Sequence, residues 1–337
     1  MRAVLIDENL NINISEANIP EVEEGYALIK VKYSGVCGTD LSISYGGLKH
    51  RINYPLIMGH EFSGVVEQLN GETDLAIGDR VVVDPLYSCG NCISCKNNQH
   101  QVCTNLKVLG IEYNGSFAEY VAIPFENIHK VPDNLSDKLA CLIEPLSVTH
   151  RAVNKADLQE NSSVLILGGG PIGLMLGLIA KEKGVKDVFL SEVNPHRLKI
   201  AKEFGFKTID GTKIKNIGEY LMDNFDGKVD VVFEAAGSPI TAQQMTTVVK
   251  EQGKVILVGL FKEPPLLDLS TMQYKEITLL TSRSYTRHEF KSSIPLSIKL
   301  EKSLEKIISH IVDVDNANEA LTIMKSGQNV LKVLIKS

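Results

Sequence analysis

The sequence predicts an α/β protein in which a β-rich unit precedes a doubly wound parallel sheet. The length of 337 residues fits two domains at ~150 residues each. Near residue 150 the chain also changes character. Short Val- and Ile-rich runs between turn residues give way to strand-like runs that alternate with helix-like segments. Such alternation is typical of a parallel sheet with helices on both faces.

Each half contributes its own set of expected elements. In the first half we expect strands at residues 26–31, 64–67, 80–83 and 120–123. In the second half we expect strands at 163–167, 187–191, 207–210, 229–234, 254–258 and 277–281, with helices at 195–204 and 241–250. The last fifty residues hold an amphipathic stretch at 317–325 and a β-like run at 330–335. These elements either return to the first unit or extend the second.

A glycine-rich turn follows the first strand of the second half. Gly168, Gly170 and Gly173 fit the pattern G-x-G-x-x-G, with Pro171 and Ile172 before the last glycine. The first glycine permits a tight turn, the second lets the backbone approach a pyrophosphate, and the third lets the helix pack on the strand. Because amide groups at the helix start point at the phosphates, the turn predicts a Rossmann-type dinucleotide site.

An acidic residue at the end of the next strand strengthens this prediction. Glu192 follows Gly173 by nineteen residues. A carboxylate there accepts hydrogen bonds from the adenosine ribose hydroxyls and repels a 2′-phosphate, so NAD is favoured over NADP. The alternative for Glu192 is a solvated residue at a strand end, and nearby Arg197 leaves a strict preference for NAD open.

Four of the six cysteines lie within fifteen residues, in the spacing C-x2-C-x2-C-x7-C: Cys89, Cys92, Cys95 and Cys103. One loop with this spacing can place four thiolates around a tetrahedral ion, which is the geometry of structural Zn2+. An iron–sulfur cluster accepts the same four ligands and is the alternative. Disulfides need an oxidising compartment, and residues 1–20 have acidic side chains and no apolar core of a signal peptide.

Composition excludes two further classes of protein. A zinc knuckle that binds nucleic acid needs a basic surface, whereas the formal net charge is −6 and the pI is about 5.8. Residues 164–180 lack charge, but they are shorter than the ~20 residues of a membrane span and contain glycines and a proline. We therefore expect a buried strand and helix there, in a soluble, cytoplasmic protein.

A second group of potential metal ligands is spread along the first half. Cys37 precedes His60 and Glu61 by about twenty residues, and Glu144 is the best candidate for a further ligand. Thiolate, imidazole and carboxylate are suitable ligands for catalytic zinc. Cys141 is the rival to Glu144, although its apolar surroundings favour a core side chain. The alternative is that His60 and Glu61 form an ordinary surface pair.

These motifs, taken together and in order, resemble those of the zinc-dependent medium-chain dehydrogenases. The resemblance spans the whole length and includes residues 37–40 (CGTD), 59–64 (GHEFSG), 78–81 (GDRV), 115–120 (GSFAEY) and 258–260 (VGL). Glu144 before a proline, in place of a cysteine, is similar to the polyol branch, which includes sorbitol, galactitol-1-phosphate and L-galactonate dehydrogenases.

The resemblance implies a fold, a catalytic site and a cofactor site. It implies a GroES-like catalytic domain at 1–148, a Rossmann domain at 149–284 and a C-terminal segment at 285–337 that returns to the catalytic domain. Catalytic zinc would lie among Cys37, His60 and Glu144, with Glu61 as a direct ligand or one that exchanges with water. Cofactor contacts fall on the following residues: Gly168, Gly170, Pro171, Ile172, Gly173, Glu192, Arg197, Val258, Gly259, Leu260 and Ser282.

The family also implies roles for residues around the substrate. Arg283 matches an active-site arginine, and Thr39 is expected to relay a proton unless it is an ordinary turn residue. Many members carry a histidine where this chain has Ser42, so we expect His50 or water to complete the proton route. His50 and Arg51 either contact an acidic group of the substrate or belong to a solvated loop.

The expected function is oxidation of a secondary alcohol of a polyol, sugar acid or polyol phosphate by NAD, with two Zn2+ per chain. Zinc would act as a Lewis acid on the alcohol oxygen. The alternatives are an L-threonine 3-dehydrogenase, a butanediol-type dehydrogenase, or a zinc- and nucleotide-binding protein without turnover. Relatives are commonly dimers or tetramers, so a homodimer or homotetramer is expected.

Overall fold

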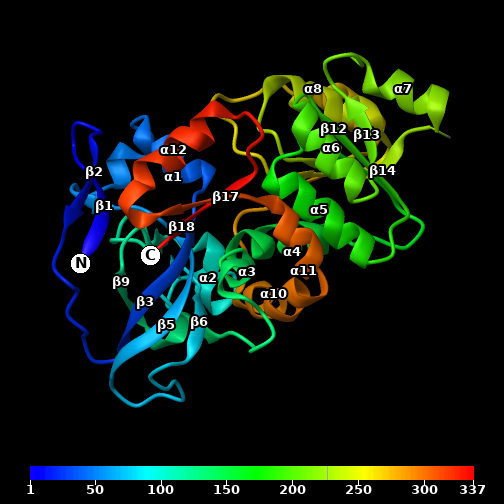
Figure 1. Ribbon diagram of the computed structural model, residues 1–337. Coiled ribbons are helices and arrows are strands. Elements are labelled where there is room, and N and C mark those ends of the chain that lie inside the picture. The colour runs from blue at the N-terminus through cyan, green and yellow to red at the C-terminus, as the bar shows by residue number, and fades with distance from the viewer. Residues whose placement is uncertain (226) are drawn as a thin grey trace. The chain divides into compact units, whose positions relative to one another are not determined.

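The computed structural model describes residues 1–225 and 227–337. Within it the chain forms two compact units. The first contains Met1–Pro145 and Thr286–Ser337, and the second contains Leu146–Tyr285. The chain therefore leaves the first unit once and returns to it, and in Figure 1 the red C-terminal strand lies beside blue N-terminal strands.

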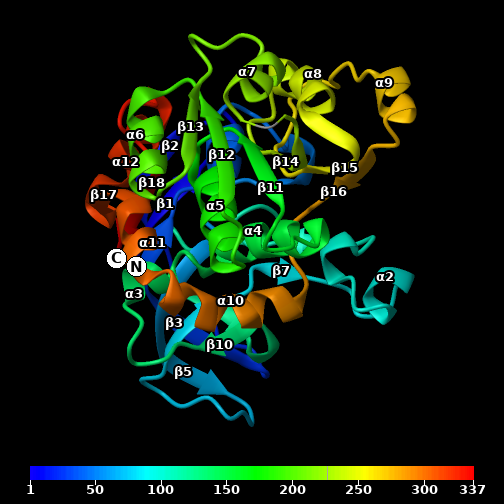
Figure 2. The same ribbon diagram turned by 90° about the vertical axis from the view of Figure 1, so that its right-hand side faces the viewer.

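The second unit holds a parallel sheet of six strands. These are β11 (Ser163–Leu167), β12 (Asp187–Glu192), β13 (Lys207–Asp210), β14 (Val229–Glu234), β15 (Val249–Leu257) and β16 (Thr278–Thr281). Their order is β13-β12-β11-β14-β15-β16, and they run side by side in Figure 2. The order reverses between β11 and β14, and doubly wound sheets bind ligands at the carboxyl ends of such strands.

Helices connect consecutive strands of this sheet. They are α5 (Pro171–Glu182), α6 (Pro195–Glu203), α7 (Ile217–Asn224), α8 (Pro239–Val248) and α9 (Leu269–Tyr274), and α4 (Ile143–Ala156) leads into β11. Crossovers between parallel strands are right-handed. Because the chain moves outward from β11 in both directions, this handedness places helices on both faces of the sheet.

The strands expected in the second half are all present, and one helix boundary is wrong. The helix expected at 241–250 ends at Val248, and β15 begins at Val249 without an intervening loop. Two β-branched residues at this junction favour extended backbone. The other end of β15 is Leu257, so Val258 lies just beyond the strand.

A buried apolar cluster holds the second unit together. It includes Leu165 and Leu167 of β11, Phe189 of β12, Val232 of β14 and Val255 of β15. Each such side chain contributes ~1.5–3 kcal/mol relative to an exposed one. The uncharged stretch at 164–180 is explained by this core, because most of its residues are buried in β11 and α5. No helix among the described residues has the length and apolarity needed to cross a bilayer.

The first unit is built mainly of β-strands. A seven-stranded sheet has the order β10-β6-β5-β3-β18-β17, with β9 also paired to β3. Its members are β3 (Tyr26–Gly35), β5 (Glu61–Asn70), β6 (Arg80–Val83), β9 (Tyr120–Pro124), β10 (Ile128–Lys130), β17 (Ile308–Asp313) and β18 (Lys332–Lys336). Smaller sheets contain β1 (Arg2–Ile6), β2 (Ile12–Glu16) and β4 (Leu56–Ile57), and β7 (Leu86–Tyr87) with β8 (Lys107–Val108).

Short helices connect these strands. They are α1 (Gly38–Ser44), α2 (Ile93–Lys96), α3 (Asp137–Ala140) and the 3-10 turns η1 (Lys49–Arg51), η2 (His100–Val102), η3 (Phe125–Asn127) and η4 (Val314–Asn316). The returning segment adds α10 (Arg287–Lys299), α11 (Glu301–Ile307) and α12 (Ala317–Ser326).

The C-terminal segment is an integral part of the first unit. Strand β18 pairs with β3 in antiparallel register, with Leu334 opposite Gly35. Val333 of β18 and Leu321 of α12 pack in one core cluster with Val4 of β1. The amphipathic stretch expected at 317–325 is therefore a helix whose apolar face covers the N-terminal strands.

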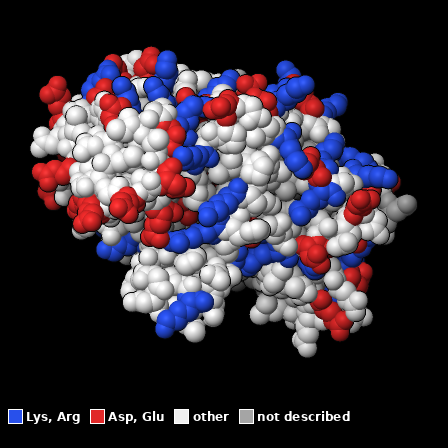
Figure 3. Space-filling view, turned by 90° about the horizontal axis from the view of Figure 1, so that it is seen from below, with Lys and Arg blue, Asp and Glu red and all other residues white. Residues whose placement is uncertain are grey.

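Exposed charged side chains contribute little to this stability. On the face shown in Figure 3, Lys and Arg are interspersed with Asp and Glu. Ion pairs such as Arg80 with Asp137 and Lys207 with Asp187 are partly exposed. Exposed pairs contribute ~0–1 kcal/mol each. The buried clusters therefore account for most of the stabilisation.

Candidate functional site

The four-cysteine loop closes on itself. The four sulfur atoms lie within 4.8 Å of one another, and the Cys92–Cys95 and Cys89–Cys103 Sγ separations are 3.5 and 3.4 Å. Sulfurs bound at ~2.3 Å to one tetrahedral ion are about 3.8 Å apart. A disulfide is much shorter, at about 2.05 Å. A cluster of several irons holds its cysteines farther apart than a single ion does. The spacing therefore fits one zinc ion.

Backbone amides act on sulfurs of this loop, including those of Cys92 and Cys103. Amide groups of Cys89 and Asn105 donate to Cys103 Sγ, each at 3.3 Å. Backbone hydrogen bonds from Cys95 and Thr104 lower the pKa of Cys92 to about 5. Burial instead raises the pKa of Cys95 to about 11. Since zinc binds deprotonated sulfur, the surroundings favour the zinc-binding form at Cys92 but not at Cys95.

A second cluster forms where β3 and β5 meet. Donor atoms of Cys37, His60 and Glu61 lie within 4.8 Å of one another. Cys37 caps helix α1 two residues after β3 ends, and Glu61 begins β5 directly after His60. The antiparallel register sets Gly35 opposite Glu61, which explains how residues more than twenty positions apart converge.

Buried acidic groups surround the imidazole. Asp40 accepts a hydrogen bond from the Cys37 amide at 2.8 Å, and its other oxygen lies 3.8 Å from His60 Nδ1. Burial by itself lowers the pKa of His60, but Asp40, Cys37 and Glu144 outweigh it and raise the pKa well above its usual value. This concentration of negative charge is suited to a divalent cation.

Glu144 and Cys141, the two candidates for a further metal ligand, have different surroundings. Glu144 is 8% exposed in the first turn of α4, and its charge acts on His60. Cys141 is fully buried, and its thiol donates to the Glu61 carbonyl at 3.2 Å. Burial raises the pKa of Cys141 well above its usual value, so it stays a neutral thiol. The rival ligand is thus a core side chain behind Glu61.

A buried lysine that the sequence motifs do not include also belongs to this cluster. Lys332 Nζ lies 2.9 and 2.6 Å from the two carboxylate oxygens of Glu61, and 3.2 Å from the Val36 carbonyl. Burial opposes charge on Lys332, but Glu61 and Cys37 outweigh it and raise the pKa of the ammonium. One signal was available: Lys332 is the single charge within the apolar run 330–335.

Of the residues expected to move a proton, Thr39 lies beside Cys37. The Thr39 hydroxyl is 3.7 Å from Cys37 Sγ and is partly accessible to solvent. Ser42 and His50 are exposed. Arg51 is occupied by an ion pair with Glu112, at 2.5 Å from Nε to Oε1.

The glycine turn adopts a conformation that larger residues cannot reproduce. Gly168 has φ +108°, and a Cβ on Gly173 would lie 1.9 Å from the Gly168 carbonyl oxygen. Gly170 caps α5, which has Pro171 at its start. The free backbone N–H groups at the start of α5 therefore lie at the turn, where they favour the binding of an anion.

Glu192 is held in place beside this turn. Its carboxylate accepts from the amides of Gly169 at 2.8 Å, Val193 at 2.6 Å and Asn194 at 2.9 Å. A carboxylate has about four lone-pair sites, so at least one remains for a ligand hydroxyl. Arg197 Nη1 lies 3.6 Å from Glu192 Oε2.

A second acidic residue, which the sequence motifs do not include, lies at the carboxyl end of the parallel strands. Glu234, at the end of β14, is fully buried and accepts from the amides of Ala236 and Gly237 and from the Thr241 hydroxyl. A Cβ on Gly259 would lie 2.5 Å from Glu234 Oε2. The contacts of Glu234 thus hold the loops that follow β14 and β15 in position.

The remaining predicted cofactor and substrate residues lie at the same end of the sheet. Val258 donates its amide to the Glu234 carbonyl, and Leu260 is exposed. After β16, Ser282 is buried and Arg283 is exposed.

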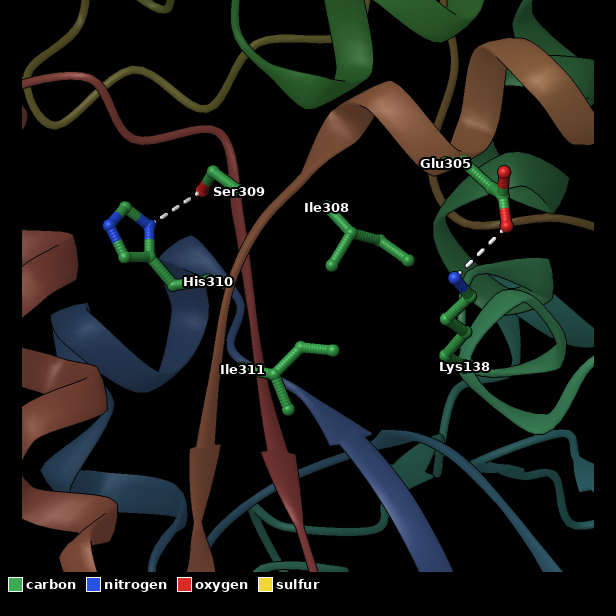
Figure 4. Close-up of a pocket in the computed structure, with 6 residues that line it drawn as sticks. All are labelled: Lys138, Glu305, Ile308, Ser309, His310 and Ile311. Carbon is green, nitrogen blue, oxygen red and sulfur yellow. Dashed lines mark hydrogen bonds and ion pairs between the residues drawn. The ribbon is translucent and has the colours of Figure 1, made fainter.

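A separate cavity of about 230 Å3 lies in the first unit (Figure 4). It is lined by Lys138, Glu305, Ile308, Ser309, His310 and Ile311. An ion pair between Lys138 and Glu305 crosses one side at 3.0 Å. None of the predicted site residues lines it, so we assign it no part in the chemistry.

Comparison with known proteins places the chain in a family. Residues 23–133 match the alcohol dehydrogenase GroES-like domain, and residues 171–299 match the zinc-binding dehydrogenase domain. A 2-dehydro-3-deoxy-L-galactonate 5-dehydrogenase of Pseudoalteromonas atlantica is 32% identical over 331 residues, covering 97% of this chain and 96% of that protein. The chain belongs to the zinc-dependent medium-chain alcohol and polyol dehydrogenases.

Two more members of this dehydrogenase family show the extent of the likeness. Sorbitol dehydrogenase of Halalkalibacterium halodurans is 34% identical over 312 residues, which are 91% of this chain and 90% of that protein. The RspB alcohol dehydrogenase of E. coli CFT073, crystallised with NADH, has a TM-score of 0.91 and 31% identity, covering 100% of this chain and 99% of that one. The family and the fold class predicted from the motifs are confirmed.

Proposed function

We propose that this dehydrogenase oxidises a secondary alcohol of a polyol, sugar acid or polyol phosphate with NAD. The cluster of Cys37, His60 and Glu61 carries the proposal, because it gathers thiolate, imidazole and carboxylate in one buried place. The names of the relatives, a sugar-acid dehydrogenase and a sorbitol dehydrogenase, support the substrate class.

Two zinc ions per chain are part of this proposal. Cys37, His60 and Glu144 would hold the catalytic ion, and the four-cysteine loop would hold the structural ion. The catalytic ion supplies Lewis-acid chemistry, which lowers the pKa of the substrate alcohol. The structural ion closes a loop with four sulfur ligands and leaves no position for substrate.

The chain's own groups would then move the proton. The Thr39 hydroxyl can accept a proton from the substrate alcohol and donate its own, because one hydroxyl both donates and accepts. Its partial exposure connects it to water. Exposed Ser42, in the same helix, is consistent with a route through water to solvent, and exposed His50 is the other candidate.

The second unit would bind the dinucleotide at the glycine turn. The start of α5 would take the pyrophosphate, and Glu192 the adenosine ribose. The negative charge of Glu192 supports NAD over NADP, while Arg197 lies close enough to weaken that preference. Arg283 is exposed after β16 and is proposed to bind a hydroxyl or carboxylate of the substrate.

We also propose a homodimer or homotetramer in the cytoplasm. β16 is the last strand of its sheet, so one backbone edge lacks a neighbouring strand among the described residues. Leu266, Leu269 and Tyr274 of the preceding segment are largely exposed. Thiolates kept for metal binding favour a reducing compartment.

A substrate panel tests the function. Enzyme of measured zinc content is mixed with NAD and one substrate at a time: sorbitol, a hexonate, a polyol phosphate, threonine or butanediol. The formation of NADH with each substrate is followed by absorbance. We expect the highest kcat/KM with a polyol, sugar acid or polyol phosphate. Highest activity with threonine or butanediol would move the enzyme to another branch, and no NADH with any substrate would refute the proposal.

Coenzyme choice is tested by Glu192→Ser. Removing the charge should improve kcat/KM for NADP relative to NAD by about tenfold or more, equivalent to ~1.4 kcal/mol. Asn194→Ala, which alters the same loop and keeps the carboxylate, is the control. An unchanged ratio would mean that Glu192 does not face the ribose.

A further inference from the structure

We propose that Lys332 is a positioning residue that keeps Glu61 off the catalytic metal and so preserves an open coordination position for substrate. The inference rests on the proposed catalytic zinc site and adds a residue that the motifs do not include. It decides between the two roles open to Glu61, which are a permanent metal ligand and a carboxylate that stays off the metal.

The ammonium of Lys332 is fully hydrogen-bonded. An ammonium has three donors, and three acceptors surround this one: both Glu61 oxygens, at 2.9 and 2.6 Å, and the Val36 carbonyl, at 3.2 Å. The two side chains are only 5% and 2% exposed. Breaking a buried pair leaves an uncompensated charge in a dry place, which is strongly unfavourable. Glu61 therefore stays on Lys332 although Cys37 and His60 are close.

The backbone that carries Lys332 is anchored on both sides. Val36 donates its amide to the Val333 carbonyl at 2.9 Å, and Ser309 Oγ donates to the Lys332 carbonyl at 3.1 Å. Strand β18 is thus bound to the segment that carries Cys37 and to β17. Lys332 enters the cluster from an anchored strand, and its ammonium, on a flexible stem, is held by the Val36 carbonyl as well as by Glu61.

A glycine makes room for the carboxylate on the lysine side. A Cβ on Gly35 would lie 2.4 Å from Glu61 Oε2 and 3.3 Å from Glu61 Cβ. The Cys141 thiol, 3.5 Å from the same point, bonds the Glu61 carbonyl and holds its backbone. Glycine, thiol and ammonium together form a fixed receptor for Glu61 behind the metal ligands.

The test compares metal binding in variants of the full-length enzyme. Wild type, Lys332→Met, Lys332→Arg and the double variant Lys332→Met/Glu61→Gln are loaded with Zn2+ or with Co2+ at the exchangeable site. The visible Co2+ spectrum reports the ligand set, and zinc loss to a chelator reports retention. Lys336→Met, on the exposed end of the same strand, is the control.

In Lys332→Met the released carboxylate should join the metal. We expect a changed Co2+ spectrum, zinc loss slower by about tenfold and kcat lower by about tenfold, in the range of effects seen for groups behind metal ligands. Lys332→Arg, which keeps a cation, should resemble wild type. Adding Glu61→Gln should return spectrum and zinc loss toward wild type.

Other outcomes overturn the inference. A merely structural lysine would give a lower melting temperature, faster zinc loss and an unchanged Co2+ spectrum, with no reversal by Glu61→Gln. If Lys332→Met does not fold, Lys332→Gln keeps two donors and serves for the same comparison. Wild type that binds no metal beyond the four-cysteine loop would instead refute the proposed catalytic site itself.

Discussion

The two cysteine-containing clusters of the first unit are built in opposite ways. The four-cysteine loop takes all its ligands from residues 89–103, and backbone amides of the same loop bond its sulfur. The cluster at Cys37 draws on the N-cap of α1, the start of β5 and the C-terminal strand β18. The ligands of the first cluster come together as soon as one loop folds, whereas those of the second meet only after the sheet has formed. This difference fits the proposed roles, stability for the loop and reactivity for the assembled cluster.

The largest expected effect is on turnover in Cys37→Ser. Losing a thiolate ligand should reduce kcat/KM at least about 1,000-fold, since a catalytic metal supplies several kcal/mol to the transition state. Metal analysis should show one zinc per chain still bound, and circular dichroism a native fold. Retained activity would contradict the catalytic assignment of this cluster.

Chelation should separate the two clusters in time. The open cluster is expected to release its zinc first, because fewer protein ligands hold it than hold a closed four-sulfur site. Activity should fall while the melting temperature stays constant, and the melting temperature should fall only when the second zinc leaves. Simultaneous loss of both would show that the two sites are not independent.

Cys95→Ser should affect stability before chemistry. A closed zinc site contributes directly to folding, so we expect a loss of about 3 kcal/mol and a melting temperature lower by roughly 5–10 °C. Lys96→Ala, a neighbouring exposed position, is the control. A variant that melts like wild type would exclude a structural role for the loop.

The smallest effect is expected at the acidic group behind the imidazole. Asp40→Asn keeps an acceptor for the Cys37 amide but removes the charge next to His60. Zinc at this cluster should bind about tenfold more weakly, as is usual for the partner of a metal-ligating histidine. Competition with a coloured chelator measures it, and unchanged affinity would show that Asp40 does not orient His60.

The sequence by itself determined features whose cause is local. The cysteine spacing lets one loop bring its four sulfurs together, and the glycines at 168, 170 and 173 are required by a turn in which any Cβ on Gly173 would meet the Gly168 carbonyl. The strands of the parallel sheet were also predictable, since an apolar run bounded by turn residues needs no distant partner to be recognised. The helix end near Val248 was not, because α8 passes into β15 without turn residues.

Only the tertiary structure decided how distant groups meet. Pairing of β18 with β3 brings Lys332 to Glu61 across 271 positions of sequence, and packing behind β5 turns Cys141 into a buried donor to the Glu61 carbonyl. The physical reason is that a buried charge is stable only beside its partner. Spacing along the chain cannot reveal a partner that lies near the other end of the sequence and is brought close by strand pairing.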